Sequence, residues 1–308
     1  MHKTESQTYR DELKQLLAKD LVFVVGMPKS GTTWVQTLID SHPQAICKGE
    51  SHFVDIFYLE LSRQLNQYNK AVTQQGGIVA HLKGYGGHVD TLSYQMEDAN
   101  YLLVIAIAMM FSKWLGKEGV SVLGEKTPDN IGYMPLLAAI FPNAKFIHVI
   151  RDPRDCAISS WFFQTSNLDR NKALKQTFEE HVLAFARFWD HNIGQGRKAG
   201  IELDQRYIEL FYEDLASNLD AQIRKAAYFL DLDTSAGTID QCAKCSTFER
   251  QSGGRKPGHE DRKSFVRKGI AGDWKNHLSD ELNNEFLSIA GSNMRRFGYL
   301  RDWSATSG

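Results

Sequence analysis

The chain has 308 residues, of which 42% are hydrophobic, so it is long enough to bury a large core. Its 36 Lys and Arg residues nearly balance its 37 Asp and Glu residues, and the net charge of −1 gives no case for binding nucleic acid or a membrane surface. Four dispersed cysteines are too few for a disulfide framework, which favours a reducing, cytoplasmic location.

The N-terminal half begins with a polar, helix-prone arm over residues 1–20 that lacks an apolar signal core. Residues 21–25 are apolar and mostly β-branched, which predicts a buried parallel strand, and a helix is expected over 31–41. Gly26 and Gly31 keep the spacing G-x-x-x-x-G between them. A strand, a tight turn and a helix N-terminus form an anion-binding cradle, because free backbone N–H groups and the helix dipole point at one spot.

The remaining elements alternate along the chain. Strands are expected at 121–124, 145–150 and 206–211, and helices at 99–116, 153–163, 174–193, 215–230 and 279–296. This alternation predicts an α/β fold, with a mostly parallel sheet covered by helices on both faces and ligands bound at the carboxyl ends of the strands. No linker or repeat is evident, so 1–308 is interpreted as one domain.

Two intermediate stretches interrupt this pattern. Residues 42–98 are weakly periodic and rich in Gly, Tyr and His, so we expect loops that supply part of an acceptor pocket. The apolar run 101–111 is too short to span a bilayer, and no membrane span is expected.

Two further strings carry anion-binding chemistry. In the first, Asp152 and Pro153 can cap and open a helix that follows Arg151, whose planar fork suits phosphate oxygens. In the second, Arg267 and Lys268 are adjacent cations followed by a glycine. Residues 252–269 hold seven basic or imidazole side chains in a Gly-rich segment, so 252–270 is expected to be a mobile loop that covers a polyanionic cofactor.

These strings together resemble the PAPS-dependent sulfotransferases, in which PAPS is 3′-phosphoadenosine-5′-phosphosulfate. Pro28-Lys-Ser-Gly-Thr-Thr-Trp34 is similar to their 5′-phosphosulfate loop, and Arg151-Asp-Pro-Arg-Asp-x-x-x-Ser159 to their 3′-phosphate segment. Arg267-Lys-Gly-Ile-Ala-Gly-Asp-Trp-Lys275 matches the signature of the cytosolic branch at every fixed position. The resemblance implies a P-loop-like sulfotransferase fold, PAPS as donor and PAP as product.

The resemblance also implies which residues bind the donor. The 3′-phosphate would be held by Arg151, Ser159 and the Arg267–Gly269 string, and Trp34 would stack on the purine. Tyr212 fits the family's Y-E-D segment, and Ser246 and Phe248 fit its T-S-F segment. Each of these aromatic residues could instead belong to the core. The full predicted set is Lys29, Ser30, Gly31, Thr32, Thr33, Trp34, Arg151, Ser159, Tyr212, Ser246, Phe248, Arg267, Lys268 and Gly269.

Catalysis requires cations at the leaving phosphate and a base at the acceptor. Lys29 and, by resemblance, Lys126 are the expected cations. The cytosolic branch has its base, a histidine, in K-T-H, where this chain has Pro128. The segment ending at Glu50 resembles the tyrosylprotein branch, so Glu50 is the expected base and His52 the reserve. Alternatively, Glu50 is a structural partner of Lys48 or Lys126.

The favoured function is transfer of the sulfuryl group of PAPS to a hydroxyl or amine of a small-molecule or carrier-borne acceptor. A P-loop kinase would need Gly-Lys-Ser/Thr where this chain has Thr32-Thr33. A third possibility is a non-catalytic protein that binds PAP or PAPS. No metal is expected, because the scheme needs none, and a lone Cys242-x-x-Cys245 lacks a second ligand pair. The sequence leaves the acceptor and the oligomeric state open.

Overall fold

The computed structural model describes residues 5–82, 92–167 and 176–300, and these residues form two compact units. The first unit comprises the described residues of Met1–Lys19 and His52–Glu118. The second comprises those of Asp20–Ser51 and Gly119–Gly308. The three strings that carry anion-binding chemistry all belong to the second unit.

The second unit is built on a five-stranded sheet with the strand order β2-β3-β1-β4-β5, in which every neighbouring pair is parallel. Because the strands are parallel, their carboxyl ends meet at one edge of the sheet, with β1 in the middle. The α/β prediction is therefore confirmed. The strands are β1 (Asp20–Gly26), β2 (Ala45–Gly49), β3 (Val122–Lys126), β4 (Lys145–Ile150) and β5 (Tyr207–Phe211).

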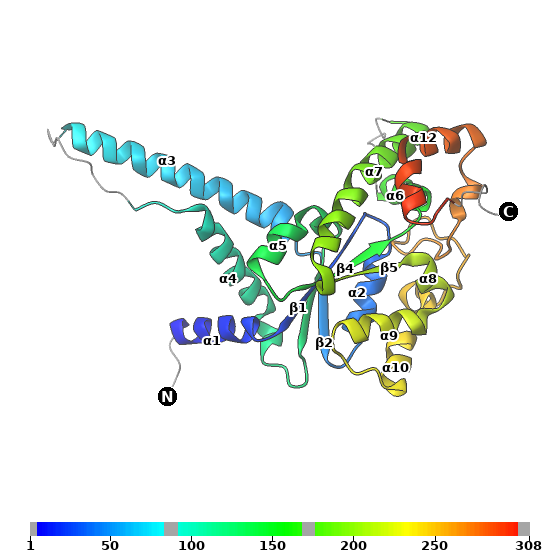
Figure 1. Cartoon of the computed structure of the whole chain (residues 1–308), viewed down its shortest axis with the longest axis horizontal. Coiled ribbons are helices and arrows are strands. Elements are labelled where there is room, and N and C mark those ends of the chain that lie inside the picture. Colours follow the sequence, from blue (N-terminus) through cyan, green and yellow to red (C-terminus); the bar gives the residue numbers. More distant parts are fainter. Residues whose placement is uncertain (1–4, 83–91, 168–175, 301–308) are drawn as a thin grey trace. The chain divides into compact units, whose positions relative to one another are not determined.

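Helices of the second unit cover both faces of this sheet. Figure 1 shows α2 (blue) with α8–α10 (yellow) on one side and α6, α7 and α12 on the other. Their bounds are α2 (Thr32–Asp40), α5 (Met134–Ile140), α6 (Pro153–Asn167), α7 (Phe178–Glu202), α8 (Tyr212–Ser217), α9 (Leu219–Phe229), α10 (Ala236–Ser246), α11 (Phe248–Gln251) and α12 (Asp280–Arg296). Short 3₁₀ turns are η2 (Pro128–Tyr133), η3 (Asp204–Arg206) and η4 (Asp273–Asn276).

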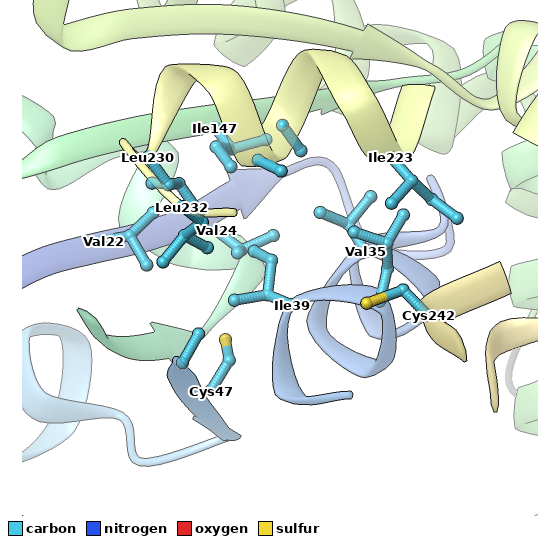
Figure 2. Close-up of a cluster of buried hydrophobic side chains, with 14 of the residues drawn as sticks. Val22, Val24, Val35, Ile39, Cys47, Ile147, Ile223, Leu230, Leu232 and Cys242 are labelled. Atoms are coloured by element: carbon cyan, nitrogen blue, oxygen red, sulfur yellow. The ribbon is translucent and has the colours of Figure 1, made fainter. Parts of the chain in front are cut away.

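A buried apolar cluster fixes the α2 helix against the sheet. Val22 and Val24 of β1 meet Val35 and Ile39 of α2 (Figure 2). Residues of α9 and α10, on the same side of the sheet, complete the cluster. Burial of such side chains contributes about 1.5–3 kcal/mol each. This packing holds the turn between β1 and α2 at a fixed place above the sheet.

The first unit is helical. It contains α1 (Glu5–Leu17), the π-helical turn η1 (Phe53–Tyr58), α3 (Leu59–Leu82) and α4 (Met96–Leu115). The segment Glu97–Leu115 is long and apolar enough to cross a membrane by length and composition, although one such helix is weak evidence, because a core helix passes the same test. The apolar stretch is thus longer than the run 101–111 that the sequence suggested.

Three predictions about elements were wrong. Residues 42–98 are not mainly loops, because they include β2, η1 and α3, while 83–91 lie outside the described residues. The helix expected over 215–230 is two helices separated at Asn218, whose side chain accepts a hydrogen bond from the N–H of Ala221 and so starts α9. The helix expected over 174–193 begins later and extends to Glu202.

Candidate active site

The loop between β1 and α2 turns sharply at Gly31, which sits just before the helix with a φ of 101°. A Cβ atom at Gly31 would lie 2.8 Å from the Tyr212 ring, so both the backbone conformation and the close approach require glycine. The Trp34 ring meets the same tyrosine edge-on, with centroids 5.4 Å apart. The first N–H groups of α2 therefore open beside an aromatic wall, as an anion-binding turn needs.

Lys29 lies inside this loop, with its ammonium group over two aromatic rings. Its Nζ is 4.0 Å from the centroid of Phe163 and 4.3 Å from that of Phe265. Burial lowers the pKa of Lys29 to about 8, because a desolvated ammonium ion is less stable than a hydrated one. Lys29 therefore loses its positive charge as the pH rises through about 8.

Glu50 and Lys126 meet at the carboxyl ends of neighbouring strands. Gly49 pairs in register with Lys126, so the residue after β2 lies beside the end of β3. The buried Lys126 ammonium donates to Glu50 Oε1 in an ion pair. Lys48, the other candidate partner, binds Asp40 Oδ2 at 2.6 Å.

Glu125, which the sequence analysis did not single out, anchors this corner. Its side chain is buried, and it accepts hydrogen bonds from the Ser51 N–H at 3.0 Å, Thr127 Oγ1 at 2.5 Å and Asn130 Nδ2 at 2.9 Å. One carboxylate thereby fixes the chain just after Glu50 and the turn just after Lys126. The available signal was a cluster of polar residues directly after a buried strand.

Arg151 joins two of the strings that the sequence singled out. Its guanidinium donates to the Lys29 carbonyl at 3.2 Å and to the Ile270 carbonyl at 3.0 Å, and it stacks over the Tyr212 ring at 4.0 Å. The side chain is buried. Because all these partners come from separate segments, Arg151 holds the loop after β1 and the segment after Arg267 together.

Asp155 provides a second link that the sequence did not reveal. This buried carboxylate accepts from the backbone N–H of Gly272 at 2.7 Å and of Trp274 at 2.8 Å. Asp152 accepts from the Arg154 N–H at 2.9 Å and so caps α6 as expected. The start of α6 is therefore fastened to the Arg267–Lys275 string.

The cations of that string are paired with carboxylates. Arg267 forms ion pairs with Glu260 and Asp273, and Lys268 Nζ lies 2.6 Å from Asp273 Oδ1. Burial alone would raise the pKa of Asp273, but hydrogen bonds from Lys268 and Arg267 hold that pKa well below its usual range. The sequence analysis found the two cations and missed both acidic partners.

A cavity of about 260 Å³ lies where these segments meet. Most of the predicted site residues line it, and Pro128, Asp129, Phe163, Gln251 and Phe265 line it as well. The predicted residues at this cavity are Lys29, Gly31, Thr32, Thr33, Trp34, Glu50, Arg151, Ser159, Tyr212, Phe248, Arg267, Lys268 and Gly269.

Four predicted residues are placed differently. Among the described residues, Ser30, Lys126 and Ser246 are buried and do not line the cavity. The Ser246 hydroxyl donates to the Cys242 carbonyl at 2.7 Å, inside its own helix. His52 belongs to the first unit, where its Nδ1 lies 2.7 Å from Asp55 Oδ2.

The chain belongs to the sulfotransferase family: the family model described as "Sulfotransferase family" matches residues 21–236. Its parallel five-stranded sheet with helices on both faces fits that class. The match covers β1 to the start of α10 and therefore the first two strings of the site.

Curated relatives are sulfotransferases too. A flavonol sulfotransferase-like protein of Flaveria bidentis is 26% identical over 181 residues, which are 53% of this chain and 58% of that protein. Sulfotransferase 1E1 of Mus musculus is 26% identical over 299 residues, which are 90% of this chain and 85% of that protein. For the first-ranked relatives the chain spans only about half of their length, as with cytosolic sulfotransferase 3 of Arabidopsis thaliana at 51%.

Solved structures of the same class share the fold. Mouse sulfotransferase SULT7A1, crystallised with PAP, superposes with a TM-score of 0.56 at 18% identity, covering 96% of this chain and 94% of that one. Sulfotransferase STF9 from Mycobacterium avium gives a TM-score of 0.52 at 14% identity, covering 94% of this chain and 85% of that one.

Proposed function

We propose that this chain is a PAPS-dependent sulfotransferase of class EC 2.8.2, which moves the sulfuryl group of PAPS to a hydroxyl or amine by in-line displacement and releases PAP. The observation that carries the proposal is the convergence of three separate anion-binding strings on one cavity. Lys29, Arg151 and the Arg267–Lys268 pair reach it from the ends of different segments. The family match over residues 21–236 supports the same reaction.

The donor fits the side chains at this cavity. PAPS carries charge at two places, a 5′-phosphosulfate and a 3′-phosphate. We assign the first to the turn Lys29–Thr33 and the second to Arg151, Ser159 and Arg267. Nε of Arg151 and of Arg267 and Nε1 of Trp34 are buried and have no hydrogen-bond partner within the described part of the chain. A buried donor without a partner costs free energy of folding unless a ligand accepts its hydrogen bond. A polyanion supplies such acceptors.

The adenine side is aromatic. Trp34, Tyr212 and Phe248 all line the cavity, and flat rings stack well on a purine. A Cβ atom at Gly269 would lie 2.1 Å from the Phe248 ring, so this glycine lets the Arg267 string close over that aromatic wall. We therefore assign Phe248 and Gly269 to the nucleoside end of the site.

Two lysines supply the positive charge for the transfer. When bound, PAPS provides the activated sulfuryl group, and its departing phosphate gains negative charge in the transition state. Lys29 lines the cavity, and Lys126 lies behind it, paired with the Glu50 that lines it. Fixed charges in a site shielded from water stabilise such a transition state without reorganisation.

Glu50 is our general base, with His52 as the alternative. The Glu50 carboxylate lines the cavity and is paired with Lys126, which keeps it close to the reacting end of the site. Its pairing also fits a purely structural role, so a kinetic test decides between them. Glu50 accepts the acceptor's proton as the acceptor oxygen or nitrogen bonds to sulfur.

We further propose that the two units act as one sulfotransferase domain over 1–308, because the family match includes segments of both. We also propose a cytoplasmic location, since the relatives include cytosolic sulfotransferases. The acceptor is a small molecule or a carrier-borne group with a hydroxyl or amine. Residues 252–270 would cover the bound donor, because Phe265 to Ile270 line the cavity.

The decisive experiment follows ³⁵S-labelled PAPS with a library of phenols, alcohols, sugars and amines. Labelled product and stoichiometric PAP are expected from the wild-type chain and not from Lys29→Ala. Lys244→Ala, which alters an exposed lysine paired with Asp240 outside this cavity, is the matched control and keeps activity. PAP binding without turnover on any acceptor would favour the non-catalytic alternative. Phosphoryl transfer from ATP would favour the kinase.

A further inference from the structure

Helix α4 presents apolar side chains on two sides. One side is the core of the first unit, where Leu103, Ile107 and Phe111 are buried. The opposite side is open: Tyr101 and Met109 are each 59% exposed. Contiguous apolar surface on one helix face commonly marks an interaction site.

The open side has the spacing of a helix-packing seam. Asp98, Leu102, Ile105, Met109 and Lys113 follow one another at intervals of four, three, four and four residues, which places them in one stripe along the helix. All five are exposed or partly exposed. The stripe is acidic at its first turn, apolar in the middle and basic at its last turn.

This pattern is complementary to itself when reversed. A two-fold axis between positions 105 and 106 would bring Asp98 opposite Lys113 of a second copy. The same axis would bring Leu102 opposite Met109, and the two copies of Ile105 would meet near the axis. Opposite charges therefore meet at both ends and apolar groups meet in the middle, as a two-fold interface requires. The antiparallel arrangement also aligns the helix dipoles favourably.

We propose that the open face of α4, defined as Asp98, Tyr101, Leu102, Ile105, Met109 and Lys113, pairs antiparallel with the same face of a second copy of this chain. The inference is independent of the proposed sulfuryl transfer, because no residue of this face lines the cavity among the described residues. A bilayer is the less suitable partner. The opposite side of α4 is already packed within its own unit, so the helix could not cross a membrane without unfolding that unit.

The first test is the oligomeric state of the full chain. Sedimentation or light scattering at micromolar concentration is expected to give twice the chain mass. Met109→Glu should reduce that mass to a monomer, because it places a charge in the apolar middle of each face. Tyr228→Glu, at an 81% exposed aromatic residue of the second unit, is the matched control and leaves the dimer intact. Wild-type far-UV circular dichroism and PAP binding in both variants would show that folding is preserved.

The second test fixes the orientation. Leu102→Cys and Met109→Cys are each expected to give little disulfide-linked dimer alone and a strong cross-link when mixed. Cross-linking of Leu102→Cys alone would indicate a parallel pair and overturn the arrangement. A wild-type monomer, or a dimer unaffected by Met109→Glu, would overturn the proposal itself. A monomer that floats with phosphatidylcholine vesicles and loses flotation in Met109→Glu would replace the second copy by a membrane surface.

Discussion

At the scale of single residues, the site depends on cations that are partly or fully buried and already have partners within the protein. Lys29 is half-buried against two aromatic rings, Lys126 is buried against a carboxylate, and Arg267 is shared between two carboxylates. Each cation can release its present partner only if a ligand replaces it with comparable interactions. Substitutions at this scale should therefore change binding and turnover in distinct ways.

Lys29 predicts the pH dependence of donor binding. Its pKa of about 8 lies below the usual 10.5, so the free enzyme loses this positive charge above about pH 8. Binding of an anion favours the protonated form, and PAP affinity should fall by up to about tenfold per pH unit above that value. Isothermal titration across pH 6.5–9.5 measures the slope. The slope should disappear in Lys29→Ala; an unchanged slope in that variant would assign it to another group.

Glu50→Gln tests the base. The amide keeps the size of the side chain but cannot accept a proton, so kcat should fall by about 10²–10⁴-fold with PAP binding preserved. The rise of wild-type kcat with pH should be lost in the variant. His52→Ala is the comparison. If Glu50→Gln turns over normally and His52→Ala does not, the base is His52.

Glu260 is predicted to compete with the donor. It pairs with Arg267, the same guanidinium that we assign to the 3′-phosphate. Glu260→Gln should therefore tighten PAP binding by about two- to fivefold, in keeping with a partly exposed ion pair of up to about 1 kcal/mol. Asp261→Asn removes the same charge one residue further on and is the control. Equal affinities of both variants would mean that Glu260 only supports the loop.

At the scale of elements, Arg255 organises the segment that we expect to cover the donor. Its guanidinium donates to the carbonyls of His259, Val266 and Arg267 at 2.5–3.0 Å and to Ser264 Oγ at 2.9 Å. One side chain thereby provides hydrogen-bond donors for three backbone carbonyls of a loop that contains no helix or strand. Side-chain contacts such as these hold the shape of the loop in place of secondary structure.

Arg255→Ala should loosen this loop while the sheet stays folded. Hydrogen exchange in residues 256–268 is expected to become faster, and PAP affinity is expected to fall several-fold, because the loop must then be ordered on binding. Exchange mass spectrometry with and without PAP provides the measurement. The exposed neighbour Lys256 supplies the control substitution, Lys256→Ala. Unaltered exchange in Arg255→Ala would show that other contacts hold the loop.

At the scale of the whole molecule, ligand specificity should appear in the stability. A ligand that binds only the folded state, present at 100 times its Kd, adds about 2.7 kcal/mol. PAP carries two phosphates and 5′-AMP carries one, so PAP should raise the melting temperature by several degrees and 5′-AMP by much less at equal concentration. Equal shifts with the two nucleotides would contradict the 3′-phosphate assignment to Arg151 and Arg267.

The sequence by itself determined four of the five strands and most of the residues that line the cavity. Four strands were predictable because parallel strands are buried on both faces and therefore read as continuous apolar runs. The strand β2 was missed because Ala45-Ile-Cys-Lys-Gly49 is short, with only three buried apolar residues before a lysine. So short an apolar run can form a strand at the edge of a sheet, where it pairs on one side only. Anion-binding strings were visible because their residue types and spacings are local properties of the chain.

Only the tertiary structure decided which charges meet. Glu260 and Asp273 both pair with Arg267, Glu125 holds the turns beside Glu50, and Asp155 fastens α6 to the segment at Gly272. Glu50 and Asp155 have partners 76 and 117 residues away along the chain. No local pattern encodes such a pairing, because it follows from the parallel register that brings the carboxyl ends of separate strands to one edge.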